Sequence, residues 1–159
     1  MTKIILTGAN GFVGSRLLAE LKQDSKFEAV GLCRRLAQKE CRSGLHAVGD
    51  LQQANLSTFL AGCDVVIHSA ARAHIMKDEV ADPLAEYRRV NVDGTLNLAR
   101  QAAVAGVKRF IFISSIKVNG EATHLGNPYK ASDAPTPEDA YGQSKLEAEQ
   151  GLVQVAGET

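Results

Sequence analysis

The feature that most constrains the fold of this chain is a glycine-rich turn directly after its first apolar run. Residues 3–7 read Lys-Ile-Ile-Leu-Thr, and glycines follow at positions 8, 11 and 14, where an amphipathic segment begins. A strand, a G-x-x-G-x-x-G turn and a helix in this order form a phosphate-binding unit. Gly8 permits the tight turn, Gly11 lets a pyrophosphate approach the backbone, and Gly14 lets the helix pack on the strand.

The turn therefore predicts that a dinucleotide binds at the N-terminus of the first helix. Free backbone N–H groups and the positive end of the helix dipole favour anions at this position. The residues predicted to hold the phosphates are Gly8, Asn10, Gly11, Phe12, Val13 and Gly14.

Apolar runs and amphipathic segments alternate along the rest of the chain. The predicted strands cover residues 3–7, 29–33, 44–48, 64–68 and 109–114. The predicted helices cover residues 13–23, 56–61, 83–106 and 140–156, and a long loop is expected over residues 118–137. Apolar strands separated by helices indicate a parallel sheet covered on both faces. We expect one doubly wound α/β domain of the Rossmann type, with three α/β/α layers, over residues 1–159.

The composition argues against several classes of protein. Lys and Arg together number 18, as do Asp and Glu, and aromatic residues make up 5% of the chain. Such a neutral chain offers no basic field to a nucleic acid or an anionic membrane. There is no run of about 20 apolar residues and no signal peptide, and the three cysteines form no C-x-x-C pair. A cytoplasmic protein without a metal site is expected, since the histidines also lack metal-ligand spacing.

The end of the second predicted strand bears on the choice of cofactor. This segment reads Gly-Leu-Cys-Arg-Arg over residues 31–35, with no Asp or Glu in reach of the ribose hydroxyls. Arg34 and Arg35 offer guanidinium donors that suit a 2′-phosphate. We therefore expect NADP in preference to NAD. The alternative, in which both arginines are solvated and NAD is accepted, stays open.

A second group of residues is suited to proton transfer. Tyr141 and Lys145 stand four residues apart in the last predicted helix and so share one face of it. A neighbouring ammonium would favour ionisation of the Tyr141 hydroxyl near neutral pH. Ser114 and Ser115 end the fifth predicted strand, at the sheet edge where such folds bind ligands. A serine hydroxyl there can hydrogen-bond the substrate oxygen whose proton Tyr141 exchanges.

In this order, the motifs resemble those of the extended short-chain dehydrogenase/reductases, the nucleotide-sugar epimerase/dehydratase family. The resemblance covers nearly the whole chain, and a bacterial branch of UDP-glucose 4-epimerases looks closest. Asp50-Leu51 is similar to the family's pair of residues beside the adenine, and residues 68–71 are similar to the family's segment that lines the cofactor. Asn91 is similar to a family asparagine that braces the active-site strand. By resemblance, the further cofactor-binding residues are Asp50, Leu51, Ser69, Ala70, Ala71, Asn91, Ser114, Tyr141 and Lys145.

The resemblance implies an NAD(P)-dependent epimerase or 4-ketoreductase that acts on a sugar carbon of a nucleotide sugar, with a UDP-sugar as the expected substrate. Ser115, Tyr141 and Lys145 would be catalytic. Tyr141 would be the general acid/base, and Lys145 would bind the nicotinamide ribose and lower the pKa of Tyr141. The chain departs from the pattern after Ser115, where Ile116-Lys117 replaces the Asp-Glu pair of the dehydratases. This difference argues against 4,6-dehydratase chemistry.

Length is the largest departure, because members of the family are considerably longer. We expect the C-terminal substrate domain to be absent from residues 1–159, which leaves an N-terminal fragment. Two hypotheses stay open, an enzyme acting on a nucleotide sugar and a non-enzymatic NADP-binding module. The resemblance also implies a homodimer that pairs through the helices at residues 83–106 and 140–156.

Overall fold

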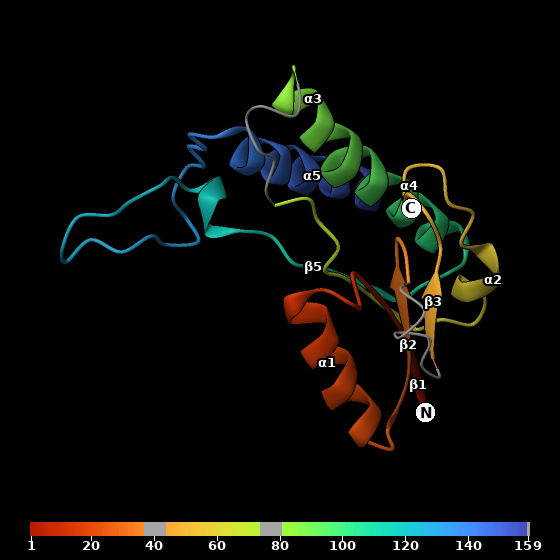
Figure 1. Cartoon of the computed structure of the whole chain (residues 1–159). Coiled ribbons are helices and arrows are strands. Elements are labelled where there is room, and N and C mark those ends of the chain that lie inside the picture. The colour runs from red at the N-terminus through yellow and green to blue at the C-terminus, as the bar shows by residue number, and fades with distance from the viewer. Residues whose placement is uncertain (37–43, 74–80, 159) are drawn as a thin grey trace.

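The centre of the molecule is a parallel sheet with the strand order β3-β2-β1-β4-β5. The structure is a computed structural model that describes residues 1–36, 44–73 and 81–158 (Figure 1). Within these ranges the strands are β1 (Thr2–Thr7), β2 (Phe27–Cys33), β3 (Leu45–Ala47), β4 (Val65–His68) and β5 (Arg109–Phe112). The chain winds outward from β1 to β3 and then crosses to β4. The topological switch point therefore lies between β1 and β4.

Helices cover both faces of the sheet (Figure 1). They are α1 (Phe12–Gln23), α2 (Ser57–Leu60), α3 (Pro83–Tyr87), α4 (Gly94–Val104) and α5 (Ala140–Gly157). Ile4 and Leu6 of β1 pack in one buried cluster with Leu18 of α1, whereas Ile5 packs in a second cluster with Leu98 of α4. Successive strand residues face opposite sides, so Ile4, Ile5 and Leu6 of β1 are all apolar because both faces of the strand are buried there. The predicted three-layer, doubly wound α/β fold is confirmed.

The long helix predicted over residues 83–106 is a rod with an irregular middle. A π-helical segment, η2 (Arg88–Asp93), joins α3 to α4. The rod begins after Asp82, whose carboxylate accepts a hydrogen bond from the backbone N–H of Ala85 at 3.0 Å. Gly106 follows the end of α4 with a φ of +74°, the left-handed conformation that commonly terminates helices. The π segment carries Asn91, and such segments often occur at functional sites.

The segment between β5 and α5 is mostly irregular. A short 3₁₀ turn, η3 (Ile116–Val118), follows β5, and residues 119–139 then form the loop that the sequence predicted at 118–137. Figure 1 shows that this loop extends away from the body of the molecule. The end of the loop lies next to η3, where the N–H of Thr136 donates to the carbonyl of Val118 at 3.0 Å.

Two further expectations can be compared with the structure. Cys33 and Cys63 are buried, and burial raises the pKa of the Cys63 thiol. The third cysteine, Cys41, lies outside the described residues. Among the helices that the structure describes, none combines the length and the apolar character needed to cross a membrane.

A buried hydrogen-bond network joins the strands at the switch point. His68 lies at the end of β4. Its Nδ1 is 2.5 Å from the hydroxyl of Thr7, and its Nε2 is 2.8 Å from the hydroxyl of Thr95. The Thr95 hydroxyl donates its single proton to the carbonyl of Asn91 at 2.6 Å. It must therefore accept from the Nε2–H of His68, and Nδ1 accepts from Thr7. This network binds β1, β4 and α4 together below the glycine turn.

Burial within this network keeps His68 neutral. The residue is 1% exposed, and burial, assisted by the positive charge of Lys145, lowers its pKa from 6.5 to about 3. In the unfolded chain the imidazole takes up a proton below pH 6.5, whereas the folded chain resists this down to about pH 3. The unfolded state thus binds more protons in this window, and stability must fall as the pH falls.

We expect the free energy of unfolding to drop by about 2 kcal/mol between pH 7.5 and pH 5 because of His68. Urea denaturation at several pH values measures this slope. His68→Gln should lower stability at pH 7.5 but remove most of the pH dependence. His46→Gln is a control at an exposed position of β3, and this variant should keep the pH dependence of stability. An unchanged slope in His68→Gln would contradict the assignment.

Candidate functional site

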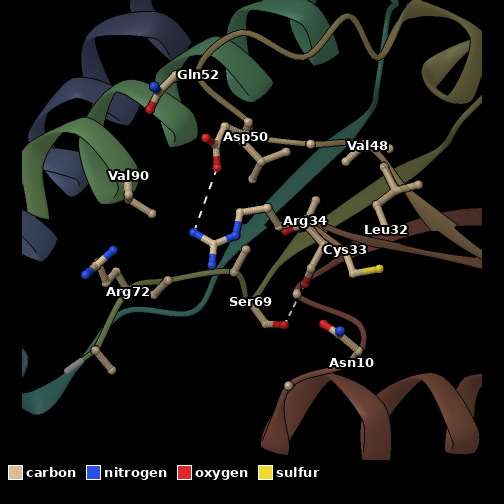
Figure 2. A pocket seen from close by; sticks show the side chains of 18 residues that line it. Asn10, Leu32, Cys33, Arg34, Val48, Asp50, Gln52, Ser69, Arg72 and Val90 are labelled. Carbon is tan, nitrogen blue, oxygen red and sulfur yellow. Dashed lines mark hydrogen bonds and ion pairs between the residues drawn. The ribbon is translucent and has the colours of Figure 1, made fainter. Parts of the chain in front are cut away.

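A cavity of about 560 Å³ opens at the carboxyl ends of the strands, at the switch point of the sheet. Figure 2 shows the side chains that surround it. They come from the glycine turn, the ends of β2 and β3, the segment after β4, and η2. The lining residues are Thr7, Gly8, Asn10, Gly11, Leu32, Cys33, Arg34, Val48, Gly49, Asp50, Leu51, Gln52, Ser69, Ala70, Ala71, Arg72, Ala73 and Val90.

The glycine turn forms one wall of the cavity and is packed against the segment after β4. Gly8 has a φ of +70°, and a Cβ on it would lie 2.6 Å from the backbone nitrogen of Ala70. Two hydrogen bonds fix the turn: the N–H of Gly11 donates to the carbonyl of Gly8 at 2.9 Å, and the Ser69 hydroxyl donates to the carbonyl of Thr7 at 2.7 Å. Glycine is therefore required at position 8 for conformation and for space.

The first turn of α1 is open to an anion. Gly11 is its N-cap, and no side chain within the described residues caps the helix there. Phe12 is 97% exposed and Val13 is 53% exposed, and neither lines the cavity. Uncapped N–H groups at a helix N-terminus are suited to binding phosphate.

The opposite wall carries charged residues that α4 helps to position. Asn97 of α4 donates to the carbonyl of Leu51 at 2.6 Å, which fixes the segment bearing Asp50. Asp50 lies 3.9 Å from the guanidinium of Arg34 and 3.7 Å from that of Arg89. Figure 2 shows Arg34 directed across the cavity toward Asp50. The predicted neighbour, Arg35, is exposed, and its carbonyl accepts a hydrogen bond from Asn10 at 3.2 Å.

Asn91 lies behind the cavity and holds its floor in place. The side chain is 1% exposed, and its carbonyl oxygen accepts from the N–H of Arg72 at 2.8 Å. Its amide donates to the carbonyl of Arg72 and to the hydroxyl of Ser144, both at 3.0 Å. Asn91 thus ties the segment after β4 to α5.

The three residues predicted to be catalytic lie on two adjoining elements, outside the residues that line the cavity. Ser115 is the N-cap of η3 and accepts from the N–H of Lys117 at 3.3 Å. Tyr141 lies in the first turn of α5, with its ring 5.9 Å from that of Tyr87. The Tyr87 hydroxyl donates to the carbonyl of Ala73 at 3.3 Å. Because Ala73 lines the cavity, this contact joins the Tyr141 region to the cavity rim.

Lys145 is buried beneath this region. Its side chain is 1% exposed, and its ammonium donates to the carbonyl of Ile113 at 2.7 Å. The ammonium also lies 3.8 Å from the centre of the Phe112 ring, an arrangement that stabilises a cation. Burial nevertheless lowers the pKa of Lys145 from 10.5 to about 8. This ammonium is therefore held by Phe112 and Ile113, the two residues just before Ser114.

An ion pair joins the two elements that carry Ser115 and Tyr141. The ammonium of Lys117, in η3, lies 2.7 Å from the carboxylate of Asp139 and 2.8 Å from that of Glu121. Asp139 is also the N-cap of α5, accepting from the N–H of Gly142 at 2.6 Å. The Lys117 ammonium holds the pKa of the Asp139 carboxyl below its usual value despite the opposing effect of partial burial.

Within the described residues, two buried side-chain polar atoms have no hydrogen-bond partner, Oγ of Ser114 and Nε of Arg72. Buried groups of this kind usually have a partner, so they indicate places that a ligand or ordered water completes. Arg72 lines the cavity and Ser114 ends the strand beside Lys145. The uncapped helix, the glycine turn and the unpartnered Nε of Arg72 together fit a dinucleotide in the cavity.

The structure places most of the predicted cofactor residues together. Those that line the cavity are Gly8, Asn10, Gly11, Arg34, Asp50, Leu51, Ser69, Ala70 and Ala71. Phe12, Val13, Gly14, Arg35, Asn91, Ser114, Tyr141 and Lys145 do not line it, and their contacts with a cofactor stay predictions. The lining residues that the sequence did not indicate end a strand, follow one or lie in η2, and they are Thr7, Leu32, Cys33, Val48, Gly49, Gln52, Arg72, Ala73 and Val90. For those at or just after the carboxyl ends of predicted strands, that position was the signal that could have found them.

Known proteins match this chain in sequence and in fold. The model of the NAD dependent epimerase/dehydratase family matches residues 4–159. A UDP-glucose 4-epimerase from Vibrio cholerae is 49% identical over 154 residues, which are 96% of this chain and 47% of that protein. The chain spans about half the length of the relatives it matches.

Solved structures of two further proteins superpose on this fold. MoeE5 in complex with UDP-glucose and NAD is 33% identical with a TM-score of 0.81, and the match covers 97% of this chain and 49% of MoeE5. The UDP-glucuronic acid 4-epimerase from Bacillus cereus, in complex with UDP-glucuronic acid and NAD, is 27% identical with a TM-score of 0.83. That match covers 98% of this chain and 52% of the epimerase.

The close approach of Gly8 to Ala70 can be tested by stability. We expect Gly8→Ala to lower the free energy of unfolding by about 2 kcal/mol or more, because strain at positive φ adds to a steric clash. Gly62 is a matched control, since its φ is +69° and a Cβ there would meet nothing within 4 Å. Urea denaturation should give a loss of only about 1 kcal/mol for Gly62→Ala. Equal losses in the two variants would refute the close packing.

The two roles of Asp139 can be separated by two substitutions. Asp139→Asn keeps an oxygen to cap α5 but removes the charge that pairs with Lys117, and we expect a loss of at most about 1 kcal/mol. Asp139→Ala also removes the cap and should cost about 1 kcal/mol more. Thermal denaturation at low and high salt measures the stability loss of each variant. Only the loss that comes from the ion pair should become smaller at high salt. Equal stability of the two variants would argue against the cap.

Proposed function

Because this chain belongs to the NAD dependent epimerase/dehydratase family, we propose that it is the cofactor-binding and proton-transferring part of a UDP-sugar epimerase. One observation carries the proposal. The cavity at the switch point has the phosphate-binding turn on one side and, through Ala73 and Tyr87, adjoins the region of Tyr141 on the other. A dinucleotide site and a general acid/base thus adjoin on one edge of the sheet.

We assign NAD to the cavity. The sequence favoured NADP and left NAD open. The family description and the two solved complexes name NAD, and Arg34 is paired with Asp50. The backbone N–H groups of the Gly11 turn would hold the pyrophosphate, and Asp50 and Leu51 would lie at the adenosine end. When bound, NAD supplies an acceptor that takes a hydride from a sugar carbon and returns it in the same cycle.

The protein residues would move the proton and orient the sugar. Tyr141 would take the proton of the sugar hydroxyl as the carbon is oxidised and give it back as the carbon is reduced. Ser115, which begins η3 beside the N-terminus of α5, would hydrogen-bond the same oxygen. The buried ammonium of Lys145 would place a positive charge one helical turn from Tyr141. The ion pair between Lys117 and Asp139 keeps η3 and α5 together.

UDP-sugars are the proposed substrates, since UDP-glucose and UDP-glucuronic acid are bound by the two solved neighbours. The homodimer implied by the resemblance also stays a proposal. Its support is that α4 and α5 pack side by side and carry exposed apolar residues, Val104 at 91% and Val153 at 74%.

Tyr141→Phe tests the proposed chemistry. We expect calorimetry to give the same NAD affinity as the unchanged chain, because the hydroxyl lies outside the phosphate and adenosine regions. The rate of interconversion of UDP-glucose or UDP-glucuronic acid should fall at least about 100-fold, the usual contribution of a general acid/base. Nuclear magnetic resonance of the sugar products measures that rate.

Tyr87→Phe is the matched control, because its ring contacts Tyr141 but no proton transfer is assigned to it. Its rate of interconversion should stay within a few-fold of the unchanged chain. An undiminished rate in Tyr141→Phe would overturn the mechanism. A chain that binds NAD and converts no UDP-sugar would instead support the non-enzymatic binding module.

A further inference from the structure

Arg34 is the residue that makes this cavity unusual for an NAD site. It follows the end of β2, where a guanidinium is well placed to receive a 2′-phosphate. In the structure the side chain of Arg34 is partly exposed. It extends across the cavity, and its Nη1 lies 3.9 Å from Oδ1 of Asp50 (Figure 2). Both residues line the cavity, so the pair lies where the adenosine end of a dinucleotide would bind.

Among the described residues, Asp50 is the carboxylate that forms an ion pair with Arg34. Asp50 also lies 3.7 Å from Arg89, but Arg89 makes two shorter hydrogen bonds, both of 2.8 Å, to Glu86. Glu86 in turn accepts from Arg72 at 2.9 Å. Guanidiniums and carboxylates thus alternate from Arg34 through Asp50, Arg89 and Glu86 to Arg72, and of these Arg34, Asp50 and Arg72 line the cavity.

We propose that Asp50 is a specificity-determining residue that makes the cavity prefer NAD to NADP by occupying the guanidinium of Arg34. An incoming 2′-phosphate could bind the guanidinium of Arg34 only by displacing the carboxylate of Asp50 from it. NAD, which carries a hydroxyl at this position, does not incur this cost. The inference rests on the proposed function only in placing a nicotinamide dinucleotide in this cavity.

The effect is expected to be modest, because both partners are partly exposed. The side chain of Arg34 is 54% exposed and that of Asp50 is 44% exposed, so solvent screens the pair. Such pairs contribute affinity ratios of about fivefold at most. A change of that size is measurable as a ratio of two dissociation constants on the same protein.

The test is a double-mutant cycle read by calorimetric titration with NAD and with NADP at low ionic strength. It uses the unchanged chain, Asp50→Asn, Arg34→Ala and the double variant. We expect Asp50→Asn to shift the affinity ratio toward NADP by about fivefold, because the freed guanidinium becomes available to the 2′-phosphate. The same substitution in the Arg34→Ala background should leave the ratio unchanged.

Glu20→Gln is the matched control, since it also removes a carboxylate paired with an arginine, Arg16 at 2.7 Å on α1, away from the cavity. Its ratio should equal that of the unchanged chain. A shift that persists without Arg34 would mean that Asp50 acts by direct repulsion and would overturn the inference. An unshifted ratio in Asp50→Asn, with NAD still bound, would overturn the inference alone. Failure of the unchanged chain to bind either dinucleotide would overturn the proposed function together with the inference.

Discussion

The hydrogen bonds of His68 are the constraint on which the rest of this structure depends. The imidazole lies at the switch point with both nitrogens satisfied, one by β1 through Thr7 and one by α4 through Thr95. A buried imidazole with an unsatisfied nitrogen would be costly, so the distance between the two strands and the helix is tightly defined. The glycine turn begins one residue after Thr7, and the cavity floor begins one residue after His68. The network thus fixes the glycine-turn wall of the cavity relative to the cavity floor.

Much of the fold could be predicted from the sequence because its signals are local. The β-branched runs, the glycine turn after Thr7 and the positive-φ glycine at 106 are each read within a few residues, and the strands and helices follow them closely. Gly8 was predicted from the glycine turn, whereas Asp50 and Ser69 were implied by the family resemblance. All three line one cavity because parallel strands present their carboxyl ends at the same edge of the sheet.

The partners of long charged side chains could not be predicted in the same way. Arg34 looked like a free phosphate ligand because nothing near it in the sequence is acidic, and Asp50 reaches it only through the pairing of β2 with β3. Lys145 shares a helical face with Tyr141, yet its ammonium is bonded to Ile113 of the β5 segment. Lys117 was noted only as a departure from the family, although it bridges η3 and α5. Each contact depends on tertiary distances that periodicity does not encode.

The π segment between α3 and α4 has a consequence for how this chain tolerates change. A π turn holds one more residue than an α turn, so η2 accommodates an extra residue without breaking the rod. Deleting one residue from η2 would restore regular winding, and α3 and α4 would keep the faces they now present. Asn91 would then lose its position between Arg72 and Ser144, while Thr95 and Leu98 kept their places. A one-residue deletion here would therefore spare the hydrophobic core and still break the tie between the segment after β4 and α5.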